Sequence, residues 1–260
     1  MTQIIAVANE KGGVAKTTTA VSLAGALIEL GKDVLLVDLD PQANLSLALG
    51  VLPHTVRRSI ADVFLNSAAP LSVSRSTEVP GLDLIPSSAE MGMAERFLPI
   101  RQQYKLILRQ ALSSIQYFDT VILDCPPSMG AITQNAMVAA DLLIIPTQAE
   151  YFSTYALRNV MNMIRSVRTQ ENPTLMYRIL ITMLDIRLNS HRYFEKQLRK
   201  TFGSAVFEAV IQIDSKLRES CLEGLPITHS FSRSRSAEQY RALAQELTQY
   251  VKKEKVKQSA

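Results

Sequence analysis

The sequence predicts a single α/β domain built on a doubly wound, mostly parallel sheet flanked by helices. Short apolar runs alternate with helix-length segments along most of the 260 residues, which is typical of right-handed crossovers between parallel strands. In most of these runs the apolar residues are successive rather than alternating, as in strands covered on both faces. We expect strands at residues 4–8, 34–37, 82–85, 120–123, 142–145 and 178–182, and helices at residues 17–30, 100–115, 133–140, 155–169 and 190–202.

A further helix is expected at the carboxyl end of the chain. Ser236-Ala-Glu-Gln239 has the spacing of a capping box, so the helix should begin at Ser236 and continue to about Val251. We therefore expect one domain over residues 1–251 and a basic, frayed tail over residues 252–260. Residues 52–80 are the least regular stretch and predict a short helix and a loop at the rim of the sheet.

Composition excludes several classes of protein. Hydrophobic residues make up 47% of the chain and charged residues 20%, which is sufficient for one sizeable core and atypical of a disordered protein. The two cysteines, Cys125 and Cys221, cannot form a disulfide framework, so a reducing cytosol is expected. The apolar stretches fall short of the ~20 residues that a membrane span needs. The first residues do not have the layout of a secretory signal, and we expect a cytoplasmic protein without a membrane anchor.

Charge is distributed unevenly along the chain. The net charge is +4, but residues 1–150 carry −4 and residues 151–260 carry +8. A basic half joined to a mildly acidic half indicates a polyanionic partner.

The most informative motif follows the first expected strand. Its residues are Lys11, Gly12, Gly13, Val14, Ala15, Lys16, Thr17 and Thr18. A strand that enters a glycine-rich turn and then a helix presents backbone N–H groups and a positive helix end to one point, which is a geometry that binds phosphate. We expect Lys16 to reach the β- and γ-phosphates and the Thr17 hydroxyl to bind Mg²⁺.

Two acidic segments follow later strands. Asp38 and Asp40 come just after the second strand, and Asp124 ends the apolar run 121–123. Ligands of open α/β sheets bind at the carboxyl ends of the strands. Asp124 is therefore expected to bind Mg²⁺ through an oxygen, directly or by way of a water. A carboxylate near the γ-phosphate is able to hold a water in line for attack. For Asp38 or Asp40 taken singly, a turn or a helix cap is the alternative.

The phosphate loop departs from the general P-loop pattern, because Glu10 stands at the first glycine position and an additional lysine, Lys11, follows it. On this deviant Walker A motif and the two acidic segments, the chain resembles the ParA/MinD family of ATPases, most closely its ParA/Soj branch. The resemblance implies ATP and Mg²⁺ as cofactors and a sandwich homodimer in which Lys11 reaches the partner's nucleotide. It also implies that Asp38 orients the attacking water and that Asp40 supports hydrolysis.

One position differs from the family at the centre of the motif. The family has glycine where this chain has Ala15, directly before Lys16. A Cβ narrows the cradle and costs on the order of 1 kcal/mol if the backbone needs a positive φ. We expect ATP binding to persist but to be weaker, or turnover to be slower.

The resemblance covers nearly the whole chain and implies a surface that binds DNA regardless of sequence. Arg187 matches the family's arginine in Leu184-Asp-Ile-Arg187, and Lys216 falls where the family usually has another basic residue. Affinity for phosphates would fall steeply with salt. A solvated surface side chain is the alternative for each cation. Where this chain has Gln212, the family commonly has a proline, which lies near the adenine of the bound nucleotide.

The function expected from these features is that of a cytoplasmic, nucleoid-associated ATPase. It would bind DNA as an ATP dimer, hydrolyse ATP weakly unless a ParB-like partner stimulates it, and position a chromosome, a plasmid or another cargo. A MinD-like membrane regulator is one alternative, but residues 245–255 lack the wide apolar face of a membrane-binding helix. A DNA-binding module with little turnover is the other.

Overall fold

The computed structural model describes residues 2–151 and 153–259. Within them one eight-stranded sheet has the order β3-β4-β2-β5-β1-β6-β7-β8. All neighbouring strands are parallel except β3 and β4, which pair antiparallel at one edge. The strands are β1 (Gln3–Val7), β2 (Val34–Asp38), β3 (Arg75–Ser76), β4 (Leu82–Ile85), β5 (Thr120–Asp124), β6 (Leu142–Gln148), β7 (Met176–Leu184) and β8 (Val206–Gln212). The predicted fold class is confirmed.

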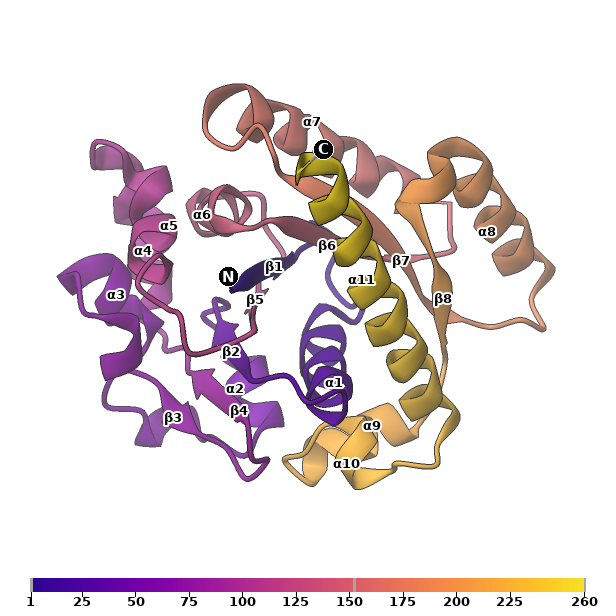
Figure 1. Cartoon of the computed structure of the whole chain (residues 1–260), viewed down its shortest axis with the longest axis horizontal. Coiled ribbons are helices and arrows are strands. Elements are labelled where there is room, and N and C mark those ends of the chain that lie inside the picture. The colour runs from indigo at the N-terminus through magenta and orange to yellow at the C-terminus, as the bar shows by residue number, and fades with distance from the viewer. Residues whose placement is uncertain (1, 152, 260) are drawn as a thin grey trace.

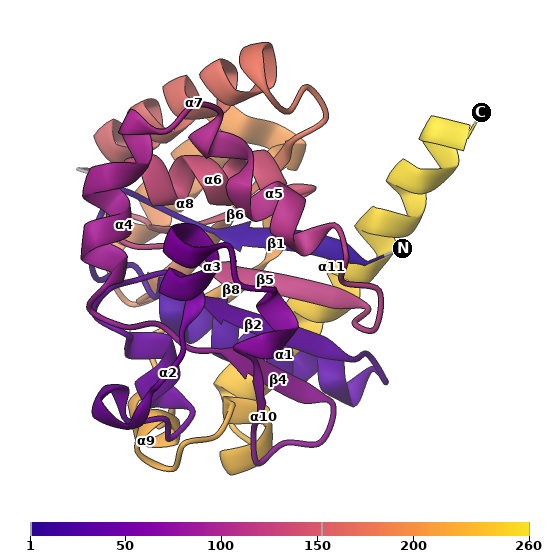
Figure 2. The ribbon, with the colours of Figure 1, turned by 90° about the vertical axis from the view of Figure 1, so that its left-hand side faces the viewer.

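Helices cover both faces of the sheet. The α-helices are α1 (Lys16–Glu29), α2 (Asn44–Ala48), α3 (Ile60–Asn66), α4 (Met91–Phe97), α5 (Ile107–Leu112), α6 (Ala131–Ala139), α7 (Ser153–Gln170), α8 (Asn189–Phe202), α9 (Lys216–Leu222), α10 (Ile227–Ser230) and α11 (Arg235–Ser259). Short 3₁₀ turns lie at Pro53–Thr55, Pro70–Ser72, Leu98–Ile100, Tyr104–Leu106 and Gly203–Ala205. Figures 1 and 2 show α5, α6 and α7 grouped on one side of the sheet, with α1 and α11 on the other.

Two hydrophobic clusters form the core, one on each face of the sheet. Successive residues of a strand belong to different clusters: Leu35 of β2 packs with the cluster that includes α4 to α7, whereas Leu36 packs with the cluster that includes α1 and α11. Both side chains are fully buried. This division explains why the strands are apolar at successive positions, because each face of a doubly covered sheet needs its own apolar side chains.

The two edge strands were not predicted from the sequence. β8 is only partly buried and exposes Glu208 in its middle, so it lacks the continuous apolar run of the inner strands. β3 has two residues, too few for any pattern. The irregular stretch 52–80 contains the expected short helix, α3, whose first turn is capped reciprocally by Ser59 and Asp62.

Two predicted helix boundaries were wrong. The segment 100–115 is not one helix, because Gln103 has a φ of 55° and breaks it into a 3₁₀ turn and the short α5. The capping box at Ser236 is also wrong. Ser234 Oγ accepts a hydrogen bond from the backbone amide of Ala237 at 3.2 Å, whereas Ser236 Oγ donates one to Asp214 Oδ2 at 2.9 Å. The spacing of residues in the sequence does not reveal the tertiary contact between Ser236 and Asp214.

The carboxyl-terminal helix continues beyond its expected end. Helical backbone of α11 reaches Ser259, eight residues past Val251, and the division into a domain of residues 1–251 and a tail of residues 252–260 stays a prediction. No helix in the part of the chain that the structure describes has the length and apolar content of a membrane span.

Candidate nucleotide-binding site

The loop between β1 and α1 forms the centre of the candidate site. β1 lies between β5 and β6, so the loop emerges in the middle of the carboxyl edge of the sheet, where open α/β sheets bind ligands. A Cβ at Gly12 or Gly13 would meet no atom of the described chain within 4 Å, and Gly13 has a φ of +70°. The loop is therefore open toward solvent on the side where phosphate groups would approach backbone N–H groups.

Ala15 has the strained conformation that the sequence analysis considered. Its φ is 65° and its ψ is 36°, in the left-handed region, at the residue that precedes α1. An L-residue with a Cβ pays about 1 kcal/mol there, whereas glycine does not. Ala15 also lines the cavity beside the loop, so its methyl group takes up space next to the phosphate cradle.

A lysine, a hydroxyl and a carboxylate converge behind the loop. Lys16 is only 8% exposed, and its Nζ donates to the backbone oxygen of Lys11 at 3.2 Å. Burial lowers the pKa of Lys16, while the charge of Asp124 acts in the opposite direction. Thr17 Oγ1 donates to Asp124 Oδ2 at 2.7 Å. The structure thus joins Asp124 to Lys16 and Thr17, which lie more than a hundred positions earlier in the sequence.

The second oxygen of Asp124 indicates which kind of ligand fits the site. Asp124 is 1% exposed, and its Oδ1 accepts no hydrogen bond from any residue that the structure describes. Burial, followed by the charge of Asp38, raises the pKa of Asp124 well above its usual value. Buried polar atoms are normally satisfied, so a carboxylate oxygen left open beside a threonine hydroxyl fits a hard cation.

The residues around this pair fit Mg²⁺ in particular. Within residues 2–151 and 153–259, no three His, Cys, Asp or Glu side chains gather into a metal-binding group. Mg²⁺ typically needs no such cage, because it keeps several waters and completes its shell with one or two protein oxygens and substrate phosphates. Thr17 and Asp124 would hold the ion beside Lys16.

Asp38 and Asp40 have different surroundings. Asp38 is fully buried: its Oδ2 accepts from Ser46 N at 2.8 Å and Ser46 Oγ at 2.7 Å, and its Oδ1 accepts from Asp40 N at 3.2 Å. Burial raises the pKa of Asp38 to about 6 although these hydrogen bonds lower it. Asp40 lines the cavity instead and accepts from Gln42 N at 2.9 Å. The catalytic role of Asp38 stays a prediction.

Lys11 is engaged within its own chain. Its Nζ donates to Gln148 Oε1 at 2.6 Å and to Glu150 Oε2 at 2.9 Å, at the carboxyl end of β6. Its neighbour Glu10 accepts from Asn159 of α7 at 2.6 Å. These partners of Lys11 were not predicted, because a contact between residues 139 positions apart leaves no local signal in the sequence.

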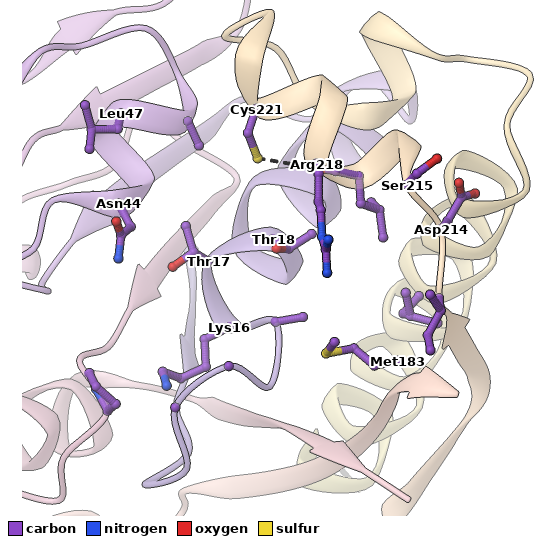
Figure 3. Close-up of a pocket in the computed structure, with 18 of the residues that line it drawn as sticks. Lys16, Thr17, Thr18, Asn44, Leu47, Met183, Asp214, Ser215, Arg218 and Cys221 are labelled. Atoms are coloured by element: carbon purple, nitrogen blue, oxygen red, sulfur yellow. Dashed lines mark hydrogen bonds between the residues drawn. The ribbon is translucent and has the colours of Figure 1, made fainter. Parts of the chain in front are cut away.

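A cavity of about 700 Å³ extends from the loop toward the last third of the chain. This volume is in the range of small-molecule sites. Its far wall consists of Met183, residues 211–215, Leu217, Arg218 and Cys221. Figure 3 shows the Arg218 side chain of α9 directed into the cavity near Thr18. The sequence analysis noted Gln212 but missed Arg218, which stands in a segment without a recognisable motif.

The two predicted DNA contacts lie after neighbouring strands. Arg187 follows β7 and Lys216 begins α9 after β8, so both project from the same edge of the sheet. The Arg187 side chain is 85% exposed and forms a two-point ion pair with Asp185, with distances of 2.9 and 2.7 Å. Lys216 is held more firmly, since its Nζ binds Glu219 Oε2 at 2.5 Å and lies over the ring of Phe231.

The chain is similar to known proteins over nearly its whole length. A family model described as an AAA domain matches residues 2–177. The sporulation initiation inhibitor protein Soj of Bacillus subtilis (strain 168) is 39% identical over 249 residues, which cover 95% of this chain and 98% of that protein. The chromosome partitioning protein ParA of Caulobacter vibrioides (strain NA1000 / CB15N) is 36% identical over 249 residues, or 94% of this chain and 93% of that protein.

Solved structures show the same architecture. A Mycobacterium smegmatis protein described as cobyrinic acid a,c-diamide synthase, with a bound ATP analogue and magnesium, is 33% identical with a TM-score of 0.87, and the match covers 97% of this chain and 96% of that chain. The ATP complex of McdA from Cyanothece, at 20% identity and a TM-score of 0.86 over 95% of this chain and 96% of that chain, shares the fold.

We predict that Ala15→Gly tightens Mg·ATP binding by about two- to fivefold, because it removes a methyl group from the cavity wall beside the phosphate cradle. Isothermal titration calorimetry measures the change. Ala43→Gly is the matched control, since Ala43 is also left-handed, with a φ of 54°, and precedes α2. Equal Mg·ATP affinities for both variants and the wild-type protein would contradict the role assigned to Ala15.

Proposed function

Because the chain belongs to the ParA/Soj family of P-loop ATPases, we propose that it binds Mg·ATP, dimerises, and binds DNA without sequence preference until hydrolysis releases it. The observation that carries this proposal is the pair formed by Thr17 and Asp124, whose buried Oδ1 is left open beside Lys16. In this way the protein would position a chromosome, a plasmid or another cargo on the nucleoid.

The residues that line the cavity fit a bound nucleotide in one orientation. The loop 11–18 would hold the phosphates, with Lys16 as the buried cation, while the wall from Met183 to Cys221 would enclose the ribose and base. When bound, Mg·ATP supplies the triphosphate to be cleaved and a divalent ion that neutralises charge. Thr17 and Asp124 would fix that ion.

Slow hydrolysis without a stimulating protein follows from the state of Asp38. Within the described chain its carboxylate accepts hydrogen bonds from Ser46 and from the Asp40 amide, and it does not line the cavity. Asp40 is the carboxylate at the cavity wall. A group that positions the attacking water must lie within hydrogen-bond reach of it, so the segment 38–46 has to rearrange before Asp38 takes that role. We propose that a ParB-like partner promotes this rearrangement.

Dimerisation would change the partners of Lys11. In the single chain its Nζ is paired with Glu150, and the two side chains are 29% and 42% exposed. Ion pairs with that much exposure contribute at most about 1 kcal/mol, so a triphosphate bound to a second copy is a stronger partner for Lys11. Exchange of Glu150 for the partner's nucleotide would tie dimerisation to the presence of the γ-phosphate.

Binding to DNA would use the edge formed by the ends of β7 and β8. The exposed Arg187 presents a guanidinium that is able to contact phosphate oxygens. Lys216 adds positive charge at the same edge, within the half of the chain that carries +8. A dimer presents two such edges, so weak contacts are multiplied by bivalency.

We predict that Lys11→Ala weakens the Mg·ATP-dependent dimer about hundredfold or more, because each dimer loses two charge-assisted contacts. Affinity of the single chain for Mg·ATP should stay within about twofold of wild type. Light scattering coupled to size-exclusion chromatography measures the dimer.

Two further variants serve as comparisons. Lys16→Ala should lose nucleotide binding altogether, and Asp40→Ala should accumulate dimers if ATP hydrolysis makes the dimers dissociate. A Lys11→Ala protein that dimerises like wild type would refute the trans contact.

We predict that Arg187→Glu preserves the Mg·ATP dimer and lowers its affinity for non-specific DNA at least tenfold at about 0.1 M salt, while the salt dependence becomes shallower by about two units of slope. Fluorescence anisotropy with duplex DNA at several salt concentrations provides the test. Arg57→Glu changes the net charge equally at an exposed position in the acidic half of the chain. If Arg187→Glu and Arg57→Glu lower the affinity for DNA equally, the change in net charge explains the loss, and Arg187 has no specific role in binding DNA.

A further inference from the structure

We propose that Glu95 of α4 is a positioning residue for the segment 125–130, which connects Asp124 to α6 and which we call the switch segment. Glu95 would hold the downstream end of this segment so that it lies correctly at the cavity during hydrolysis. The inference rests on the proposed ATPase function and adds a residue from outside the phosphate loop and the acidic motifs.

The contact of Glu95 with α6 is bidentate. Its Oε1 accepts from Ala131 N and its Oε2 accepts from Ile132 N, both at 2.9 Å. These are the first two amides of α6, which have no partner inside the helix. A carboxylate at that end satisfies both N–H groups and is favoured by the helix dipole. Gly130, which precedes the helix, has no side chain for this purpose, so α4 supplies the cap from a distant part of the chain.

The Glu95 side chain, and not the backbone conformation, is the reason that a glycine is needed at position 130. Its φ is −83° and its ψ is −160°, and this φ does not restrict the position to glycine. A Cβ at this position, however, would lie 1.6 Å from Glu95 Oε1 and 2.8 Å from Glu95 Cδ. Because the clashing atoms are the end of a flexible side chain, an alanine would displace the Glu95 carboxylate and leave the fold in place.

The upstream end of the switch segment is fixed independently. The backbone oxygen of Asp124 accepts a hydrogen bond from Leu39 N at 2.9 Å, and Cys125 N donates one to Val7 O at 3.1 Å. These bonds keep the end of β5, and with it the Thr17–Asp124 pair, in the centre of the sheet. Loss of Glu95 would therefore loosen only the other end of the segment. Pro127, in the middle of it, lines the nucleotide cavity.

Helix α6 would remain folded without Glu95. At its carboxyl end the buried Asn172 donates from Nδ2 to the backbone oxygens of Met137, Val138 and Ala140 at 3.1, 3.2 and 2.8 Å. Ile132 and Met137 are buried in the core. The expected consequence is a shift of the first turn of α6 and of the switch segment, which affects the reaction step more than nucleotide binding.

The test is a double-mutant cycle of Glu95→Ala and Gly130→Ala. Each single change should lower kcat about tenfold at saturating Mg·ATP while KM changes less than about twofold, since misplacement of groups around the reacting atoms costs rate rather than ground-state binding. The double variant should be no slower than Glu95→Ala, because the added methyl group then has no carboxylate to displace. Glu95→Gln, which keeps one acceptor oxygen, should be intermediate.

A second readout uses the nucleotide-free protein. Amide hydrogen exchange of residues 131 and 132 should accelerate in both single variants and not further in the double variant, while exchange in β5 stays unchanged. Single effects on kcat that multiply to about a hundredfold in the double variant would overturn the inference, as would unchanged kcat with accelerated exchange. If the wild-type protein hydrolyses no ATP with DNA and partner present, the proposed function itself fails.

Discussion

A buried carboxylate with one satisfied oxygen determines the organisation of the site. Asp124 ends the central strand β5, receives the hydroxyl of Thr17 on one oxygen, and leaves the other open next to Lys16. Burying such a group is costly unless its charge is compensated. The doubly covered sheet supplies the burial and the phosphate loop supplies one cation, Lys16, while the Oδ1 oxygen, which has no partner among the described residues, fits a second cation. The site is thus constructed around a ligand that brings positive charge with it.

Residues outside the sequence motifs hold Asp38, Lys11 and the start of α6 in place around this carboxylate. Ser46 of α2 holds Asp38, Glu150 after β6 holds Lys11, and Glu95 of α4 holds the start of α6. In the first two contacts a motif residue is held by a residue with no motif of its own, and in the third Glu95 holds the helix that follows the segment after Asp124. In the proposed cycle, activation would exchange the partners of Asp38 and Lys11 in a site that is already ordered, while Glu95 would keep its contact with α6.

Sequence reasoning predicted the centre of the molecule better than its periphery. β1 and α1, which flank the glycine-rich turn, are confirmed to within one residue at each boundary, because buried parallel strands and a glycine-rich turn leave strong local patterns. The edge strand β8 was missed because its side chains are half exposed. The true cap of α11 and the partners of Lys11 were missed because tertiary contacts decide them.

The most direct measurement of the central claim is the dependence of ATP affinity on Mg²⁺, determined by calorimetry for the wild-type protein and for Asp124→Asn. The account predicts that Mg²⁺ tightens ATP binding by at least about tenfold in the wild-type protein, since one further charged contact contributes about 1.4 kcal/mol or more. It predicts that the same ion has almost no effect in the variant. Equal ATP affinity of the wild-type protein with Mg²⁺ and with a chelator would contradict it.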